Sequence, residues 1–301
     1  MTIGIARHVR SKLKLIACEA AELPIVRLVA EPLYRRAFQR PFQEGNAYYG
    51  VFDSYDQARA EVPTSLSPTY DVAGAGNMYT DRIDRIRVSD YPMVYWLSRL
   101  VQAGQRRIFD LGGHIGISYY GFRRHVQYPE DLRWLVHDVP AVTAAGRERA
   151  RELDPEQRLS FTDSREAADG HDVLVCSGAL QYLDYTLSEL LGRLTTPPQH
   201  ILVNLTPMHP TRSYFTIQNM GVAACPYRVM AVPEFVGAVE SLGYTVVDRW
   251  ESLERDLRIP FFASYSIDRY YGFYFRLDHA GSSTRMNEPV DTSCKKVNRA
   301  A

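Results

Sequence analysis

The pattern of hydrophobic and polar positions changes near residue 105. From there, short apolar runs alternate with stretches of helical periodicity, which predicts a parallel sheet with crossover helices. The predicted strands are residues 107–110, 132–138, 159–162, 172–177 and 201–206. The predicted helices are 141–153, 187–194 and 232–242, the last ending at Gly243. Two further strand-like runs, 244–250 and 270–277, are predicted to close an α/β fold of seven strands as an antiparallel pair.

The first 44 residues follow a different pattern, in which basic side chains are set among aliphatic ones. This mixture predicts an amphipathic helix that is broken at Pro24 and Pro32. Such a helix either lies on a membrane surface or forms a lid whose apolar face packs on the main domain. The lid is the favoured interpretation.

Three regions are expected along the chain. Residues 1–104 form an N-terminal helical cap region, and residues 105–279 form the domain that contains the sheet. Residues 280–301 are polar and aperiodic, and they are predicted to be a flexible tail.

Composition narrows the function classes. The chain has 35 Lys and Arg against 35 Asp and Glu, and this balance argues against polymeric nucleic acid as a substrate. The four cysteines are far apart and form no metal-ligand spacing, so no metal is predicted. No apolar stretch is long enough for a transmembrane segment, and no secretory signal is expected. We therefore expect a cytoplasmic protein that acts on a small-molecule substrate.

The most informative segment is the run from Arg107 to Gly116, where a hydrophobic strand ends in Asp110 and continues into a glycine-rich turn. Ligands of open parallel sheets bind beyond the carboxyl ends of the strands, so a cofactor is expected here. The glycines allow a tight turn and a close approach of the backbone to a ligand. Taken alone, such a loop fits a structural turn or another nucleotide site equally well. The loop residues are Asp110, Gly112, Gly113, His114 and Gly116.

The next two predicted strands also end in polar residues. Asp138 follows the strand 132–138, where a carboxylate can accept both ribose hydroxyls of an adenosine. Its alternative role is to cap the helix that begins near Pro140. Thr162 and Asp163 end the following strand, where contacts to an adenine amino group are expected. Helix capping is an equally good role for Asp163.

The turn after the fourth strand is expected to face the reacting group. Ser177 leaves room there, while Gln181 and Tyr182 project towards the same place. No histidine or carboxylate occupies this turn, so the chemistry depends on positioning a competent nucleophile. Asn204 on the fifth strand adds a polar contact, and His209 is the first candidate for a general base.

The loop spacing resembles the D-x-G-x-G-x-G motif of class I S-adenosylmethionine (SAM) dependent methyltransferases, with His114 in place of the middle glycine. This resemblance implies a Rossmann-like, seven-stranded class I methyltransferase sheet with helices on both faces. It also implies SAM as the cofactor. Asp110 would hold the ammonium of SAM, and the glycines would lie against its methionine end.

The chain more closely resembles a family of bacterial methyltransferases associated with polysaccharide and natural-product gene clusters. The resemblance extends from about residue 48 to 277, and it implies that the segment around Tyr48, Tyr49 and Tyr70 caps the SAM pocket. The alternative for this segment is a surface helix and loop capped by Asp53. The matching segments are 49–58, 69–71, 110–113, 138–140, 177–183, 233–235 and 243–244.

This family also includes azetidine-2-carboxylate synthases, which cyclise SAM and release methylthioadenosine. The resemblance thus implies a methyltransferase acting on a small molecule in bacterial secondary metabolism or glycan biosynthesis, with SAM cyclisation as the alternative. Tyr182 and Asn204 are compatible with either reaction. A second alternative is a non-catalytic SAM-binding partner protein. A homodimer formed through the N-terminal block is the hypothesis for self-association.

Overall fold

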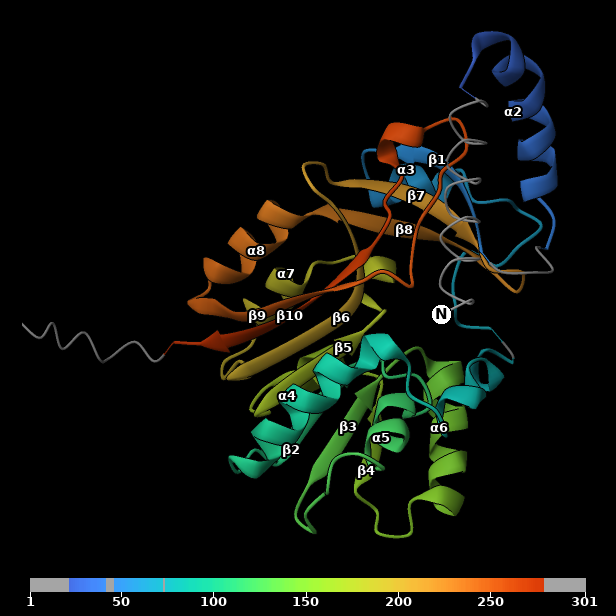
Figure 1. The fold of residues 1–301 in the computed structure, drawn as a ribbon. Helices are drawn as coiled ribbons and strands as arrows, with labels where there is room; N and C mark the ends of the chain where they lie inside the picture. The colour runs from blue at the N-terminus through green and yellow to red at the C-terminus, as the bar shows by residue number, and fades with distance from the viewer. Residues whose placement is uncertain (1–21, 42–45, 73, 279–301) are drawn as a thin grey trace, which may run out of the picture.

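The computed structural model describes residues 22–41, 46–72 and 74–278. The predicted tail, 280–301, and the basic positions before residue 22 lie outside these ranges. Seven strands form the centre of the molecule in the order β4-β3-β2-β5-β6-β10-β9 (Figure 1). Their bounds are β2 Arg107–Leu111, β3 Arg133–His137, β4 Leu159–Thr162, β5 Val173–Ser177, β6 His200–His209, β9 Tyr244–Ser252 and β10 Tyr270–Leu277.

The direction of these strands defines the fold class. Strands β2 to β6 pair in parallel, whereas β10 runs antiparallel to both β6 and β9. This order, with one reversed strand near the edge, is that of a class I methyltransferase sheet. The α/β fold and all seven predicted strands are therefore confirmed.

Helices cover both faces of the sheet because alternate strand residues are apolar towards opposite sides. Ile108 of β2 packs with α4 and α6, whereas its neighbour Phe109 packs with α7 and α8. The predicted helix 232–242 is present as α8, but it ends at Glu240 with Ser241 as its C-cap, so Gly243, with a φ of +89°, lies in the turn beyond the cap. The helix bounds are α4 Tyr91–Gln102, α5 Ile117–Phe122, α6 Pro140–Leu153, α7 Leu187–Leu191 and α8 Val232–Glu240.

Three strands that were not predicted extend the sheet to ten strands. They are β1 Ala47–Phe52, β7 Tyr214–Asn219 and β8 Ala224–Ala231, and they form an antiparallel unit. Strand β8 joins the main sheet through its last residues, where Met230 pairs with Met208 of β6. Because β6 runs on to His209, beyond the predicted end at residue 206, it reaches this second unit.

The N-terminal region is not wholly helical, because β1 is one of its elements. Helix α2 spans Pro24–Phe38 and continues through Pro32, so the predicted break there is wrong. Its apolar side is exposed, and the prediction that this side packs on the main domain is therefore also wrong. Helix α3, Tyr55–Ala60, is capped by Ser54 rather than by Asp53.

Short 3-10 helices complete the fold and carry several residues of the site. They are η1 Ala75–Asn77, η2 Thr80–Arg82, η3 Val88–Asp90, η4 Arg165–Ala168, η5 Leu180–Tyr182 and η6 Ala263–Tyr265. In the part of the chain that the structure describes, no helix is long and apolar enough to cross a membrane.

Candidate cofactor site

Asp110 lies at the carboxyl end of β2 and is completely buried. Its Oδ2 accepts a hydrogen bond of 3.1 Å from the indole N–H of Trp134 on β3. Its Oδ1 is buried and has no hydrogen-bond partner among the described residues. Burial raises the pKa of this carboxyl to about 7, and the neighbouring Asp138 adds to the shift. A buried carboxylate oxygen without a hydrogen-bond donor destabilises the folded protein unless a ligand donates a hydrogen bond to it.

Two glycines of the loop allow close approaches. A β-carbon on Gly113 would lie 2.5 Å from the carboxyl carbon of Asp110. Gly112 has a φ of +71°, and a β-carbon there would lie 2.2 Å from the Cβ of Ala179 in the turn after β5. The loop therefore fits closely both over Asp110 and against the turn that is expected to face the reacting group.

His114 takes the position of the usual middle glycine and keeps a glycine-like backbone, with a φ of +57°. Its Nε2 donates a hydrogen bond of 3.0 Å to the carbonyl of Ala75 in η1. Burial lowers the pKa of the imidazole to about 4, so the ring is neutral at neutral pH. The rings of Tyr70 and Tyr79 lie 6.2 and 5.9 Å from the His114 ring, centroid to centroid. The histidine thus holds Tyr70, Ala75 and Tyr79 over the glycine loop.

Asp138 follows β3 and receives two backbone N–H groups. Its Oδ2 accepts from His114 at 2.9 Å, and its Oδ1 accepts from Val139 at 2.8 Å. Burial raises the pKa of Asp138 to about 6. The N-cap position of α6 is Val139, so Asp138 is not the helix cap. Each carboxylate oxygen keeps a further lone pair for a ligand hydroxyl.

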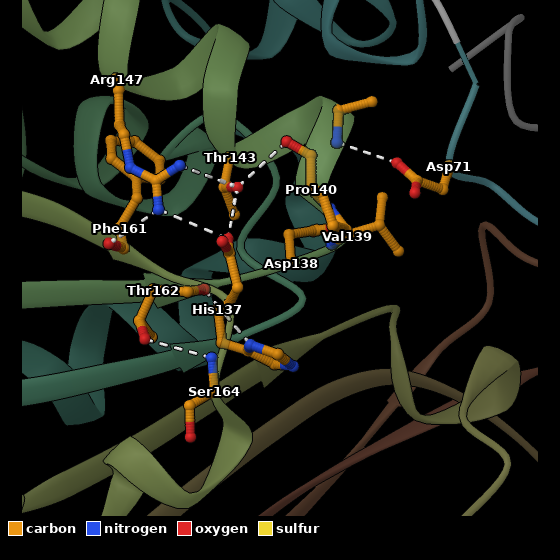
Figure 2. Close-up of polar contacts among 12 residues, drawn as sticks. Asp71, His137, Asp138, Val139, Pro140, Thr143, Arg147, Phe161, Thr162 and Ser164 are labelled. Carbon is orange, nitrogen blue, oxygen red and sulfur yellow. Dashed lines mark hydrogen bonds and ion pairs between the residues drawn. The ribbon is translucent and has the colours of Figure 1, made fainter.

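The beginning of α6 is capped by a residue from the N-terminal region. Figure 2 shows the carboxylate of Asp71 facing this end of the helix, where its Oδ1 accepts the backbone N–H of Ala141 at 2.8 Å. A carboxylate at this end satisfies an unpaired donor and interacts favourably with the helix dipole. Asp71 therefore joins the cap segment to the helix that follows Asp138.

Replacement of Asp71 by alanine is expected to lower the free energy of unfolding by about 0.5–2 kcal/mol, the usual effect of losing an N-terminal cap. Urea unfolding followed by circular dichroism measures this loss. Asp84→Ala is the matched control, because Asp84 forms an exposed ion pair with Arg124 and should change stability by less than about 1 kcal/mol. Equal effects of the two variants would contradict the capping role.

Asp163 follows β4 and binds two side chains of α6, Thr143 and Arg147, which Figure 2 labels. Its Oδ1 accepts from the Thr143 hydroxyl at 2.8 Å and forms an ion pair of 3.3 Å with Arg147. These two contacts lower the pKa of the exposed Asp163 carboxyl. The backbone carbonyl of Thr162 accepts from the ring Nδ1 of His137 at 3.3 Å. The adenine contact expected of Thr162 and Asp163 stays a prediction.

The turn after β5 holds two further polar atoms without partners. The hydroxyl of Ser177 and the Oε1 of Gln181 are buried and unpaired among the described residues. The other end of the Gln181 amide donates to the carbonyl of Gly178 at 2.8 Å, which fixes its orientation. This turn lies against Gly112, so its unpaired atoms and the Oδ1 of Asp110 belong to one region.

Tyr182 belongs to a network that the sequence reading missed. Its hydroxyl donates to Gln218 Oε1 at 2.7 Å, and Gln218 Nε2 donates to the hydroxyl of Tyr48 at 2.9 Å. The ring of Tyr227 lies within 5.4 Å of both tyrosine rings, and its hydroxyl is 2.9 Å from that of Tyr270. The network connects β1, β7, β8 and β10 to the turn after β5. The one sequence signal for this network was the expectation that the segment around Tyr48 lies over the site.

Asn204 and His209 have their polar atoms occupied. Asn204 is buried, donating to the carbonyl of Ser89 at 3.0 Å and accepting from the indole N–H of Trp250 at 2.9 Å. His209 accepts two backbone N–H groups on Nδ1, and its Nε2 donates to the carbonyl of Ser264 at 3.3 Å. These contacts leave no ring lone pair for a general base. The catalytic roles expected of Asn204 and His209 stay predictions.

Among residues 22–41, 46–72 and 74–278, no group of three or more His, Cys, Asp or Glu side chains is arranged to hold a metal ion.

No protein-family model matches this chain, and no curated protein does. Among solved structures, an O-methyltransferase family protein from Burkholderia thailandensis is 21% identical, with a TM-score of 0.42 over 69% of this chain and 60% of that protein. The chain thus spans less than two thirds of that protein. Magnesium protoporphyrin IX methyltransferase from Synechocystis, with bound S-adenosylhomocysteine (SAH), is 9% identical over 69% of this chain and 96% of that one, with a TM-score of 0.45. The methyltransferase CcbJ from Streptomyces caelestis is 14% identical over 68% and 98%, with a TM-score of 0.41.

Proposed function

We propose that this protein is a SAM-dependent methyltransferase that acts on a small molecule. The observation that supports it best is the buried carboxylate of Asp110, whose unpaired oxygen lies beneath a glycine loop at the carboxyl end of β2. A cationic ammonium satisfies both the charge and the unpaired acceptor. The order of the seven strands supports the same proposal, because open parallel sheets bind ligands at this edge.

Each end of the cofactor has a candidate partner. Asp110 would hold the ammonium of the methionine moiety, and the free lone pairs of Asp138 would accept the ribose hydroxyls. Thr162 and Asp163 would lie beside the adenine, and Tyr70, Ala75 and Tyr79 would cover the loop and exclude water. SAM, when bound, supplies an activated methyl group on its sulfonium.

The chain's own contribution to the reaction is then to position the acceptor. The unpaired Ser177 hydroxyl and the Gln181 carbonyl lie in the turn after β5, and Tyr182 is oriented by Gln218. With His209 fully hydrogen-bonded, we assign no general base. Positioning of an already competent nucleophile is enough for transfer from an activated donor.

Calorimetry with SAM and SAH tests the cofactor assignment. Binding at millimolar concentration or below is expected for both compounds, and no binding of either would contradict the proposal. Asp138→Ala should weaken binding by about 1–3 kcal/mol, because ribose hydroxyls would lose their acceptor. Asp163→Ala is the comparison variant, because it removes the carboxylate proposed to lie beside the adenine. Unchanged affinity of a folded Asp138→Ala variant would reduce Asp138 to a support for the glycine loop.

Incubation with SAM alone separates methyl transfer from cyclisation. A methyltransferase without an acceptor should leave SAM as it is in a control without protein, as measured by mass spectrometry. A cyclase needs no second substrate, because the amine of SAM attacks its own γ-carbon. Methylthioadenosine formed together with azetidine-2-carboxylate would therefore overturn the proposal. A protein that binds SAM but does not consume it, either alone or with any acceptor from a natural-product panel, would instead be a non-catalytic partner.

A further inference from the structure

Helix α2 presents its apolar side away from the other residues that the structure describes. Positions 25, 28, 29, 32 and 33 lie on one side of a helix with 3.6 residues per turn. The exposed fractions are 84% for Ile25, 78% for Leu28, 63% for Val29 and 61% for Leu33. In a surface helix of a water-soluble monomer, such a stripe normally faces the core. Figure 1 shows α2 at the outer edge of the molecule, beside β1.

The opposite side of α2 is attached to the protein and fixes this orientation. Phe38 is 2% exposed, and the hydroxyl of Tyr34 donates to the carbonyl of Tyr48 on β1 at 2.9 Å. Arg27 forms an ion pair of 2.8 Å with Glu31, and its guanidinium lies 5.1 Å from the ring centroid of Phe262. The helix therefore contacts the protein with aromatic and charged side chains and leaves its aliphatic ones in water.

The unpaired charges beside this stripe on the described residues of α2 and after it are positive. On α2 itself the acidic Glu31 is already paired with Arg27, whereas Arg36 is exposed at the end of the stripe. Arg40 follows in the same direction and is exposed as well. Aliphatic side chains edged by arginine are the features of a helix that lies in a membrane interface.

We propose that α2 docks this protein onto the surface of an anionic lipid bilayer through Ile25, Leu28, Val29 and Leu33. The aliphatic side chains enter the boundary between headgroups and acyl chains, and Arg36 and Arg40 contact lipid phosphates. A second copy of the chain fits less well, because a symmetric contact would bring the exposed Arg36 and Arg40 of two copies towards each other.

Co-flotation of the full chain with lipid vesicles tests this docking. The protein should float with vesicles of phosphatidylcholine containing one quarter phosphatidylglycerol. It should float on the order of tenfold less with phosphatidylcholine alone or in roughly 0.5 M salt. Leu28→Ser combined with Leu33→Ser should reduce flotation on the order of tenfold or more, because two large aliphatic groups no longer enter the lipid.

Two exposed side chains elsewhere provide the matched control. Val88 and Leu253 are 73% and 71% exposed, so Val88→Ser with Leu253→Ser removes comparable apolar surface and should leave flotation unchanged. Arg36→Gln with Arg40→Gln should remove the preference for anionic vesicles. SAM binding by each variant shows that the fold is intact.

Several results would overturn the proposal. One is that the wild-type protein fails to float with anionic vesicles. Another is that the α2 variants float as well as the wild type does. A dimer seen by light scattering that Leu28→Ser and Leu33→Ser convert to a monomer, without vesicle binding, would assign the stripe to a second copy. A clear loss of thermal stability in that variant, again without vesicle binding, would assign the stripe to intramolecular packing.

Discussion

Replacement of Gly112 by alanine is expected to lower the free energy of unfolding by about 2–5 kcal/mol and to abolish measurable SAM binding. The new Cβ would meet the Cβ of Ala179 at 2.2 Å, and neither atom can rotate away. The backbone must therefore shift, at a cost of about 1–3 kcal/mol. A φ of +71° costs alanine about 1–2 kcal/mol more. Chemical denaturation and calorimetry measure the two effects.

Two further variants separate the clash from the backbone strain. Gly104 also has a positive φ, +98°, but a Cβ there would meet no other atom within 4 Å. Gly104→Ala should therefore lower the free energy of unfolding only through backbone strain, by about 1–2 kcal/mol. Ala179→Gly introduced together with Gly112→Ala removes the close contact and should restore most of the difference. A double variant as unstable as Gly112→Ala alone would show that the contact with Ala179 is not the cause.

The affinity for SAH is expected to rise with pH between about 5.5 and 7.5, through the ionisation of Asp110. Its folded-state pKa is raised to about 7, so the carboxyl is protonated below that pH and cannot pair with an ammonium. Below the pKa, affinity should rise by up to about tenfold per pH unit. Asp138, with a pKa raised to about 6, adds to the same trend.

Asp110→Asn is the variant that isolates this effect. It keeps an acceptor for the Trp134 indole but carries no charge, so affinity at pH 7.5 should fall on the order of tenfold to a hundredfold. The remaining pH dependence should be shallower than in wild type. An Asp110→Asn variant with wild-type affinity at pH 7.5 would show that this carboxylate does not hold the ammonium.

The same substitution should stabilise the protein without ligand at alkaline pH. A carboxyl whose pKa is raised on folding binds more protons in the folded state than in the unfolded state. The wild-type protein therefore loses stability as pH rises from the unfolded value near 3.8 to about 7. Asp110→Asn removes that loss, and thermal unfolding at pH 8 should show a higher midpoint. Gain of stability with loss of binding is the combination expected of a ligand-binding residue.

The sequence by itself determined the main sheet, because its strands are short apolar runs bounded by turn residues and joined by periodic helices. Strands β2, β5, β6 and β10 are buried on both faces, so their near-continuous apolar pattern does not depend on distant partners. The glycine loop was also predictable, since positive φ at Gly112 and Gly116 is a local requirement. His114 accommodates the same backbone geometry with a side chain, which the glycine motif alone could not foresee.

The tertiary structure decided how distant segments meet. Strands β1, β7 and β8 form an antiparallel unit although β1 is separated from β7 by more than 150 residues, and no local pattern specifies that pairing. Asp71 caps α6 and His114 binds Ala75 for the same reason, because hydrogen bonds across the fold depend on its three-dimensional arrangement. The composition of α2 predicted an amphipathic helix, but only its contacts with β1 and Phe262 decided that the aliphatic side faces outward. Periodicity shows which residues share a face, whereas the surface that this face meets depends on the packing of the whole chain.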